Sequence, residues 1–355
     1  MSFKNGMNPE AKRFGNGVKF ISVMDILNNQ FIYYDNIRAS VEIADGDLDT
    51  YGVKYGDILF QRSSETLEDV GQANVYLDSK PAVFGGFVIR GKSKGNYNPL
   101  FFRYLLTSPT VRKRVIVKGA GAQHFNIGQD GLSKVCIDIP CIKEQEKIAR
   151  LLALLDERIA TQNKIIDKLQ SLIKGISNRI FASIQGIEYR MGDIVTITNG
   201  NSNVQDAVTQ SKDGLYPFFD RSEDIKYLHT FLFDKEAIIY PGEGTEFMPR
   251  YFKGKFALHQ RCYAIFDFNE IINARFLYFY LKTRNSYFVK NAVGSTVPSL
   301  RLDTFQKLKV IIPPTKTQHS VSSCLSSMEQ KCNVEKRILY KLLNQKQYLL
   351  RQMFI

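Results

Sequence analysis

The stretch Pro140-Cys141-Ile142-Lys143-Glu144-Gln145-Glu146-Lys147-Ile148-Ala149 opens a segment that runs to about residue 181 without an internal proline. Apolar residues recur in this segment at alternating steps of four and three, which is the heptad pattern of a coiled-coil helix. The positions on this seam are Ile148, Leu152, Leu155, Ile159, Gln162, Ile166, Leu169, Ile173, Ile176 and Ile180. The pattern predicts one long helix whose narrow stripe packs against a single partner helix.

The same opening pattern of proline and glutamine recurs 173 residues further along the chain, where Pro313 and Gln318 match Pro140 and Gln145. A second seam follows, formed by Val321, Leu325, Met328, Cys332, Glu335, Leu339, Leu342, Lys346, Leu349 and Met353. We therefore expect two copies of one unit, each a globular part followed by a long helix. Two ordinary amphipathic helices, each lying on its own domain, remain the alternative.

Chain connectivity constrains how the two helices would pair. The first helix leads from the first globular part to the second, and the second helix starts there, so a packed pair is antiparallel. Gln162 and Glu335 hold equivalent seam positions and would form a polar layer that fixes register, or would simply be solvated. From Ile148 to Ile180 the helix spans roughly 48 Å, the rise of about 14 base pairs of duplex DNA.

The globular parts show a mixed pattern of strands and short helices. Strand-like stretches are 17–23, 57–60, 82–84, 87–89, 134–139, 237–240, 262–266 and 308–312, and short helices are expected at 100–108 and 274–283. The predicted fold class is α+β, with two similar mixed α/β domains separated by two long antiparallel coiled-coil helices in a pseudo-twofold arrangement. The predicted domains are 1–140, a central helix 141–185, a second domain 186–312 and a C-terminal helix 313–355.

Composition limits the classes of function. The 355 residues carry a formal net charge of +13, and the two helical segments hold +8 of it. Such a charge favours a polyanionic partner, most often nucleic acid. No apolar run is long enough to span a bilayer, and residues 1–6 lack the apolar core of a secretory signal. Five scattered cysteines without a CxxC pair indicate free thiols in a reducing compartment, so we expect a cytoplasmic protein.

Catalytic and metal-binding signatures are missing from the sequence. It contains no phosphate-binding GxxxxGK[ST] loop, no HExxH and no CxxC…CxxC, so we expect no enzyme activity, no cofactor and no metal. Side chains that suit DNA do occur beside strands and turns, including the loop 240–244, because Arg and Gln can pair with base edges and Lys neutralises phosphate. The predicted DNA-binding residues are Gln61, Arg62, Ser63, Arg112, Lys113, Arg114, Lys118, Gln123, Arg250, Lys253, Lys255, Gln260 and Arg261. A plain solvated surface is the alternative for each of them.

The layout resembles the specificity subunits of type I restriction–modification systems. The closest resemblance is the helix that begins Pro140-x(4)-Gln145-x-x-Ile148-Ala149, and the copy that begins at Pro313 is a weaker form in which Lys346 interrupts the seam. Residues 56–63 resemble an interior strand of the family, and Gly192-Asp193-Ile194 resembles the opening of its target-recognition domain. The resemblance covers nearly the whole chain.

The resemblance implies a non-catalytic subunit that binds double-stranded DNA. Its two target-recognition domains would each read half of a split site, and the helices would set the spacer between the halves. Partners would be methyltransferase subunits, two of them, and motor–nuclease subunits, with no membrane. The alternatives are a stand-alone DNA-binding regulator and a coiled-coil scaffold without restriction partners.

One departure from the family pattern concerns the first copy. Asn5-Gly6 matches Asn199-Gly200, so the first copy has no counterpart of Gly192-Asp193-Ile194. We expect the first domain to be short by a strand. The C-terminus should end nearby, where it could cover the gap.

Overall fold

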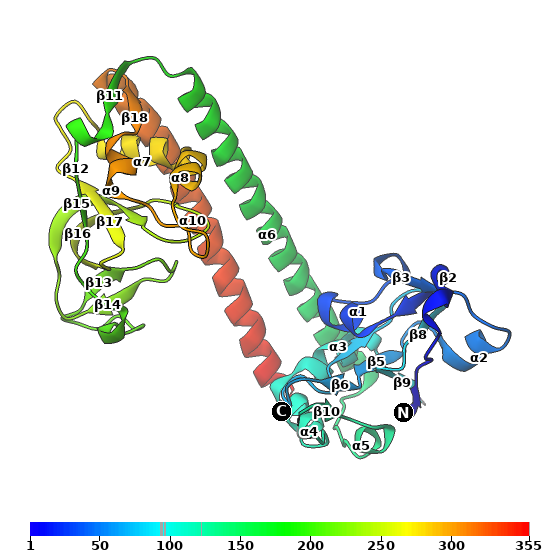
Figure 1. The fold of residues 1–355 in the computed structure, drawn as a ribbon. Coiled ribbons are helices and arrows are strands. Elements are labelled where there is room, and N and C mark those ends of the chain that lie inside the picture. The colour runs from blue at the N-terminus through cyan, green and yellow to red at the C-terminus, as the bar shows by residue number, and fades with distance from the viewer. Residues whose placement is uncertain (93–94, 96, 122, 355) are drawn as a thin grey trace. The chain divides into compact units, whose positions relative to one another are not determined.

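The computed structural model describes residues 1–92, 95, 97–121 and 123–354 (Figure 1). The chain divides into two compact units. Unit 1 comprises Met1–Asn163 and Ile338–Ile355, and unit 2 comprises Lys164–Arg337. Each unit therefore combines one globular part with segments of both long helices.

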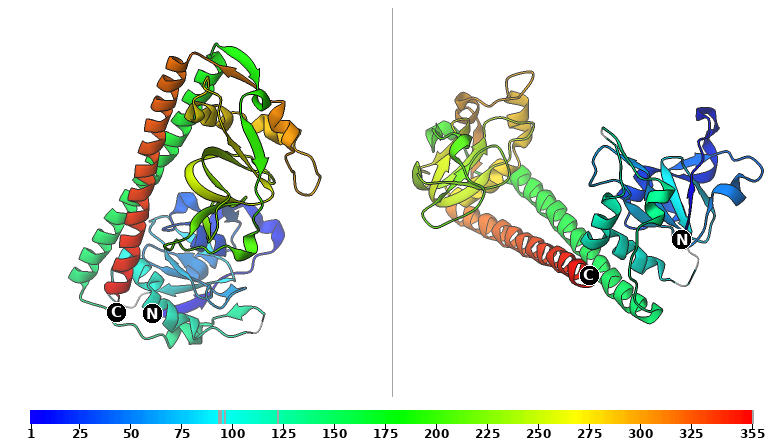
Figure 2. Two further views of the ribbon diagram at one scale, coloured as in Figure 1. Left: turned by 90° about the vertical axis from the view of Figure 1, so that its left-hand side faces the viewer. Right: turned by 90° about the horizontal axis from the view of Figure 1, so that it is seen from below.

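The two long helices are α6, Ile142–Ser183, and α10, Thr315–Gln352. In unit 1 the start of α6, at Leu152, shares a hydrophobic core with Leu349 of α10 and with Phe354, which follows α10. In unit 2 the end of α6 shares a core with the start of α10, through Phe181 and Leu325, and the two segments run side by side (Figures 1 and 2). The pairing is therefore antiparallel, as the sequence predicts.

The heptad seams describe the buried faces of both helices. Every position of the two predicted seams is buried or half-buried, including the polar pair of positions Gln162 and Glu335, which are 8% and 7% exposed. Each helix also packs on the globular part of its unit, because Leu152 clusters with Phe102 and Leu325 clusters with Phe276. Within each unit the buried stripe therefore contacts the globular part and the other long helix.

Unit 1 contains two four-stranded sheets and a short ribbon. The first sheet has the order β1 (Ser2–Asn5), β9 (Val88–Lys92), β5 (Ile58–Gln61) and β7 (Ala73–Val75). The second has the order β3 (Ala39–Val41), β2 (Phe14–Ile21), β8 (Ala82–Phe84) and β4 (Gly52–Val53). The ribbon joins β6 (Ser63–Ser64) to β10 (Phe125–Asn126). Its helices are α1 (Val23–Asn28), α2 (Asp47–Tyr51), α3 (Pro99–Thr107), α4 (Pro109–Ile116) and α5 (Gln129–Ser133).

Unit 2 is built on a six-stranded sheet and a separate pair of strands. The sheet order is β12 (Thr196–Asn199), β17 (Cys262–Phe266), β15 (Phe233–Pro241), β16 (Arg250–Leu258), β13 (Tyr216–Phe219) and β14 (Lys226–Leu228). The pair joins β11 (Ile187–Arg190) to β18 (Lys309–Ile312). Its helices are α7 (Ala274–Lys282), α8 (Asn285–Asn291) and α9 (Leu302–Gln306).

The two units share one strand plan. The order β1-β9-β5-β7 in unit 1 corresponds to β12-β17-β15-β16 in unit 2. In both units a parallel pair follows, β2 with β8 and β13 with β16. The long strand β16 therefore pairs with both β15 and β13, whereas in unit 1 the equivalent pairings are divided between β7, which pairs with β5, and β8, which pairs with β2. The predicted fold class, two similar mixed α/β domains with two long antiparallel helices, is confirmed.

One strand expectation is wrong. Residues 134–139 alternate apolar and polar side chains, yet residues 135–139 have no regular secondary structure, whereas the matching stretch in unit 2 forms β18. The reason is the lack of a strand partner: β18 pairs with β11, whereas no residue that the structure describes forms a strand beside 135–139. The C-terminus does end in unit 1, where the Phe354 ring lies 5.4 Å from that of Phe101 on α3.

A glutamine at the start of each long helix ties that helix to its domain. Gln145 accepts a hydrogen bond from the Asn98 backbone N–H and donates to the Pro140 carbonyl. Gln318 accepts from the Asn273 N–H and donates to the carbonyls of Ile271 and Pro313, all between 2.7 and 2.9 Å. Asn98 and Asn273 are themselves the N-caps of α3 and α7. The repeated glutamine thus joins the long helix to the first turn of the domain helix.

A carboxylate on each long helix, buried at Asp156 and half-buried at Glu329, forms a second tie. In unit 1 the Asp156 carboxylate accepts from the Tyr104 hydroxyl at 2.8 Å and from the Lys346 ammonium at 2.5 Å. In unit 2 the Glu329 carboxylate, 173 residues later, accepts from the Tyr278 hydroxyl at 2.9 Å and from Lys282 at 2.8 Å. The anchoring chemistry is repeated, but the lysine comes from α10 in unit 1 and from α7 in unit 2.

Candidate nucleic-acid interface

The turn between β16 and β17 presents two of the predicted DNA-binding residues. His259 donates its N–H to the Phe219 carbonyl, and Gln260 donates its N–H to the Ser202 carbonyl, so the turn is fixed to two neighbouring segments. The Cys262 N–H closes the turn on the His259 carbonyl. The side chains of Gln260 and Arg261 are left exposed at its tip. A rigid turn with exposed amide and guanidinium groups suits contacts to base edges.

Arg261 is oriented by the loop that joins β15 to β16. Its guanidinium Nη1 lies 2.7 Å from Oε1 of Glu243, and the side chain of Arg261 is 62% exposed. Gly242 allows this approach, because a Cβ at that position would lie 1.9 Å from the Arg261 carbonyl oxygen. The pair holds one exposed cation and one partly buried carboxylate side by side.

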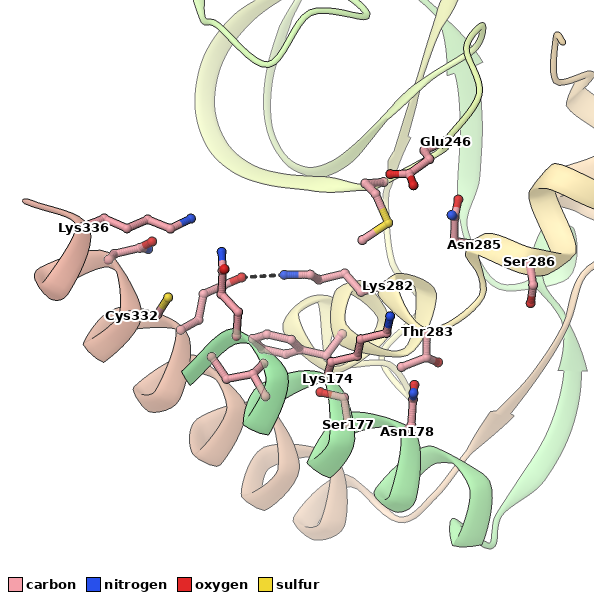
Figure 3. Close-up of a pocket in the computed structure, with 16 residues that line it drawn as sticks. Lys174, Ser177, Asn178, Glu246, Lys282, Thr283, Asn285, Ser286, Cys332 and Lys336 are labelled. Atoms are coloured by element: carbon pink, nitrogen blue, oxygen red, sulfur yellow. Dashed lines mark hydrogen bonds and ion pairs between the residues drawn. The ribbon is translucent and has the colours of Figure 1, made fainter. Parts of the chain in front are cut away.

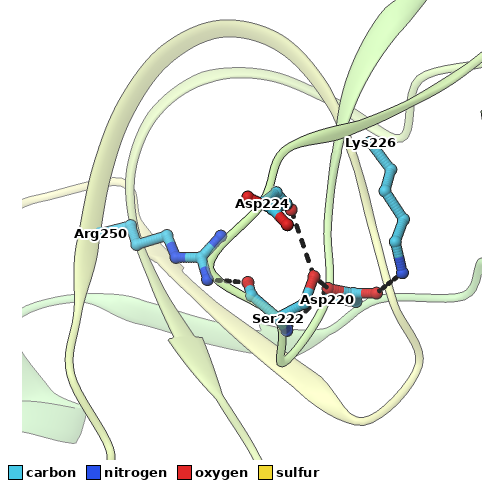
Figure 4. A network of polar contacts seen from close by, with 5 residues as sticks. All are labelled: Asp220, Ser222, Asp224, Lys226 and Arg250. Atoms are coloured by element: carbon cyan, nitrogen blue, oxygen red, sulfur yellow. Dashed lines mark hydrogen bonds and ion pairs between the residues drawn. The ribbon is translucent and has the colours of Figure 1, made fainter. Parts of the chain in front are cut away.

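A polar network centred on Asp220 lies in the same region of unit 2 (Figure 4). The Asp220 carboxylate, 6% exposed, accepts from the Ser222 backbone N–H at 2.8 Å and from the Lys226 ammonium at 2.6 Å. Burial alone would raise the pKa of Asp220, but the hydrogen bonds from Lys226 and Ser222 outweigh it and the pKa lies below its usual value. Arg250 donates to the Ser222 carbonyl, so this predicted residue stabilises the loop rather than projecting from it.

These groups line a cavity of about 530 Å³ in unit 2. Its walls include Asp220, Lys226, Glu243, His259, Gln260 and Arg261. Burial lowers the pKa of His259, against the opposing effect of the Asp220 carboxylate, so its imidazole is neutral near pH 7. The structure therefore brings Gln260 and Arg261 together with Arg250 nearby.

The two predicted lysines of β16 lie apart from this cavity. Lys253 and Lys255 are exposed and stand opposite Glu236 and Asp234 of β15 in the strand register. The Lys255 ammonium lies 4.8 Å above the ring of Phe231. Exposed cations of this kind suit phosphate contact rather than base reading.

In unit 1 the predicted residues 61–63 lie at and after the end of β5, as Gly242 and Glu243 follow β15 in unit 2. Gln61 is buried and donates to the Ser63 carbonyl, so it shapes the turn. Arg62 is exposed, and its Nη1 lies 3.3 Å from the Gly86 carbonyl. Ser63 pairs with Asn126 through both the β6–β10 ribbon and a side-chain hydrogen bond. The ribbon brings 61–63 beside the loop that carries Gln123, which is exposed.

The basic run around α4 divides into two kinds of side chain. Arg112 is half-buried and donates to the carbonyls of Glu68 and Val70, so its guanidinium stabilises the loop that contains these residues. Arg114 donates to the Cys136 carbonyl at 3.0 Å but stays exposed. Lys113 and Lys118 are exposed, and neither forms an ion pair with any residue whose position the structure describes. These two lysines and Arg114 offer positive charge to a polyanion.

Sequence reasoning missed three residues of this region: Asp220, Lys226 and Asn126. Asp220 and Lys226 pair with each other inside one loop, and Asn126 reaches Ser63 across 63 residues. No local motif marks such residues. Aligning the two copies of the repeat could have identified Asn126, because it matches Ser299, which forms a β-bridge with Glu243 in unit 2.

A second cavity of unit 2 lies away from these turns (Figure 3). It has a volume of about 570 Å³ and is lined by residues of α6, α7, α8 and α10. Lys174, Lys282 and Lys336 point toward it, and only Lys282 has an acidic partner among the residues with assigned positions, the Glu329 carboxylate. The cavity adds positive charge to the side of the helices.

The described part of the chain offers neither a metal-binding cluster nor a membrane-spanning helix. No cluster of three or more His, Cys, Asp or Glu side chains with metal-site geometry is found among those residues. No helix within the same residues combines the length and the apolar character needed to cross a bilayer.

Comparison with known proteins gives consistent matches. The chain is 28% identical over 138 residues to the Type I restriction enzyme EcoDI specificity subunit of Escherichia coli, an alignment that covers 39% of this chain and 30% of that protein. It is 23% identical over 207 residues to the EcoKI specificity subunit of Escherichia coli strain K12, covering 56% of this chain and 44% of that protein. The chain therefore matches less than half the length of these curated relatives.

A solved structure shows the same fold along the whole chain. The S subunit of a type I restriction–modification system from M. genitalium superposes with a TM-score of 0.62 at 18% identity, covering 100% of this chain and 93% of that one. The family model described as "Type I restriction modification DNA specificity domain" matches residues 3–171 and 187–344. These two matches take in both globular parts and most of both long helices, and the chain belongs to the family of type I restriction–modification DNA specificity domains.

Proposed function

We propose that this chain is the non-catalytic specificity subunit of a type I restriction–modification complex. Residues 1–140 and 186–312 act as two target-recognition domains, each reading one half of a split DNA site. The helices 141–185 and 313–355 set the number of unread base pairs between the halves. Double-stranded DNA, two methyltransferase subunits and motor–nuclease subunits are the partners, and the cytoplasm is the location.

One observation carries the proposal: the frame is repeated while the exposed turns differ. Gln145 and Gln318, and Asp156 and Glu329, make equivalent ties between helix and domain. At matching places after the central strand, however, unit 1 presents the Ser63–Asn126 pair and unit 2 presents Glu243 with Arg261. Recognition of two different half-sites requires a shared scaffold that presents different side chains to the DNA.

The proposed base-reading residues are the exposed side chains at the turns, together with the half-buried Ser63. In unit 2 they are Gln260 and Arg261, and in unit 1 they are Arg62, Ser63 and Gln123. Lys113, Arg114, Lys118, Lys253 and Lys255 bind phosphates. Arg112, Arg250 and Gln61, whose polar groups bond to the protein backbone, act by holding these turns.

The test is methylation mapping in cells that express this chain with its methyltransferase. Arg261→Ala should relax or change the base preference in one half-site only. Arg62→Ala should do so only in the other half-site, because the two arginines lie in different units. Lys253→Ala is the control: it should weaken methylation at all sites without changing the sequence read. A change in both half-sites from Arg261→Ala would contradict the assignment.

The spacing role has its own test. Removing one heptad from each long helix shortens the helices by about 10 Å, the rise of about three base pairs. The mapped site should keep both halves and lose spacer. An unchanged spacer would defeat this role, and DNA binding that does not weaken with rising salt would favour a scaffold instead. Tight specific binding by the free chain, without a methyltransferase, would favour a regulator.

A further inference from the structure

The cavity of about 570 Å³ in unit 2 is lined by side chains from four helices (Figure 3). Lys174 and Ser177 come from α6, Phe279 from α7, Asn285 from α8 and Lys336 from α10. All of them belong to unit 2, so one compact unit builds the whole cavity. The volume falls in the range of sites that enclose a small organic molecule.

Two of the three lysines at this cavity lack an acidic partner among the residues that the structure describes. The Lys282 ammonium lies 2.8 Å from the Glu329 carboxylate, so its charge is balanced within the protein. Lys174 and Lys336 are exposed and form no ion pair with any described residue, and their side chains point toward the cavity (Figure 3). Two positive charges on α6 and α10 are therefore available to a ligand.

Two neutral groups can donate hydrogen bonds into the same space. Oδ1 of Asn285 accepts from the Phe247 backbone N–H at 2.8 Å, which orients the amide and leaves Nδ2 without a partner among the described residues. Ser177 is 7% exposed, yet its hydroxyl makes no hydrogen bond with any residue that the structure describes. Since buried polar groups are nearly always hydrogen-bonded, this hydroxyl needs a partner from outside the protein.

The rest of the wall is partly apolar. Phe279 is 1% exposed, Ile173 is half-buried, and Met248 adds a thioether side chain that is 40% exposed. The Glu246 carboxylate is exposed at another part of the wall, where it can accept from a hydroxyl or amino group of a ligand (Figure 3). The cavity therefore suits a molecule with an anionic end and an apolar body.

We propose that this cavity binds a small phosphate monoester with an apolar body. A monoester carries a charge of about −1.5 to −2 at pH 7, which the ammonium groups of Lys174 and Lys336 balance. Lysine binds phosphate oxygens as a point charge, whereas the planar guanidinium of arginine matches a carboxylate, and no arginine is among the described residues that line the cavity. A DNA phosphate is a diester with one charge, so the charge balance favours a monoester. This site is separate from the turn that carries Gln260 and Arg261.

Isothermal titration calorimetry of the full chain with phenyl phosphate tests the site. Phenyl phosphate joins a phosphate monoester to an apolar ring. It should bind at least about tenfold tighter than inorganic phosphate, because the ring is removed from water against the apolar wall. Phenol, which lacks the phosphate, should bind at least about tenfold weaker than phenyl phosphate, because it cannot pair with the two ammonium groups.

Four variants of the chain locate the site. Asn285→Asp keeps the oxygen that accepts from Phe247 but places a negative charge beside the phosphate, so it should abolish binding. Lys336→Gln and Ser177→Ala remove a charged and a neutral donor and should weaken binding about tenfold and about threefold. Lys168→Gln is the control: it alters an exposed lysine of α6 outside the cavity, changes the net charge as much as Asn285→Asp does, and should leave binding unchanged.

Three results would overturn the proposal. The first is absence of phenyl phosphate binding to the wild-type chain, or binding that Asn285→Asp and Lys336→Gln leave unaltered. The second is phenol that binds as tightly as phenyl phosphate, because the cavity would then be an apolar site. The third is displacement of phenyl phosphate by duplex DNA, because the ammonium groups would then bind the DNA backbone.

Discussion

Replacing Lys346 with methionine tests the anchor that joins α10 to unit 1. The Asp156 side chain is 7% exposed, and its two oxygens have different partners. Oδ2 accepts from Tyr104 and Gln30, at 2.8 and 2.7 Å, whereas Oδ1 lies 2.5 Å from the Lys346 ammonium. Methionine keeps the aliphatic stem of lysine but leaves Oδ1 without its cation.

Breaking a buried ion pair by removing one partner costs about 3–5 kcal/mol. Lys346 is 27% exposed and Asp156 keeps two neutral donors, so we expect the lower end, about 3 kcal/mol. At about 1.4 kcal/mol per factor of ten, local opening should become roughly 100-fold more frequent. Hydrogen–deuterium exchange of the α3 amides and of the end of α10 measures this opening directly.

A control variant and a double variant distinguish the loss of the ion pair from the general effect of replacing a lysine on α10. Lys341→Met changes an exposed lysine of the same helix and should leave exchange unaltered. The double variant Asp156→Asn with Lys346→Met should recover most of the lost protection, because no buried charge remains. If Lys346→Met exchanges no faster than Lys341→Met, the reasoning from the buried carboxylate is wrong.

Three further variants probe the other ties and one titrating group. Tyr278→Phe removes the hydroxyl that donates to Glu329 and should cost about 1.5–3 kcal/mol, measured by exchange in α7, with Tyr340→Phe on the exposed side of α10 as control. Gln318→Ala leaves the Asn273 N–H and two carbonyls unpaired and should destabilise the start of α7 by about 1–3 kcal/mol; equal exchange in wild type and variant would refute the tie. Since burial holds the pKa of His259 below 6.5, the unfolded state binds its proton first, so stability should fall as pH drops from 6.5 toward the lowered pKa. His259→Asn should remove that part of the pH dependence, and an unchanged denaturation profile would contradict it.

The sequence predicted the helices well because their signal is local and periodic. All seam positions are buried or half-buried, and the helix bounds differ from the predicted segments by only a few residues. Lys346 shows the limit of that signal. It interrupts the apolar pattern and looks like a defect, yet it pairs with Asp156, a residue 190 positions away that lies beside the first seam rather than on it. Periodicity reports which face is buried but not which polar groups meet there.

One strand prediction failed because it depended on a distant partner. Residues 134–139 have the alternation of a strand, but a strand forms only with a neighbour, and β18 has one in β11. Arg112 and Arg250 have the right chemistry for DNA, but their guanidinium groups bind backbone carbonyls of Val70 and Ser222. Counting basic residues cannot distinguish a cation offered to phosphate from one that fastens a loop.

The matching positions Ser63 and Glu243 indicate that the two half-sites differ in chemistry. Both follow the central strand of their unit, and both bridge to the segment before α5 or α9, at Asn126 and at Ser299. Unit 1 offers neutral hydroxyl and amide groups there, while unit 2 offers a carboxylate that holds Arg261. Arginine reads guanine and a carboxylate accepts from cytosine, whereas hydroxyl groups pair with several bases. We therefore expect a G·C pair in the half-site of unit 2, and Glu243→Ser should relax that position alone in the methylation map. If Glu243→Ser alters a position in the other half-site, then Ser63 and Glu243, although structurally equivalent, do not contact DNA in equivalent ways.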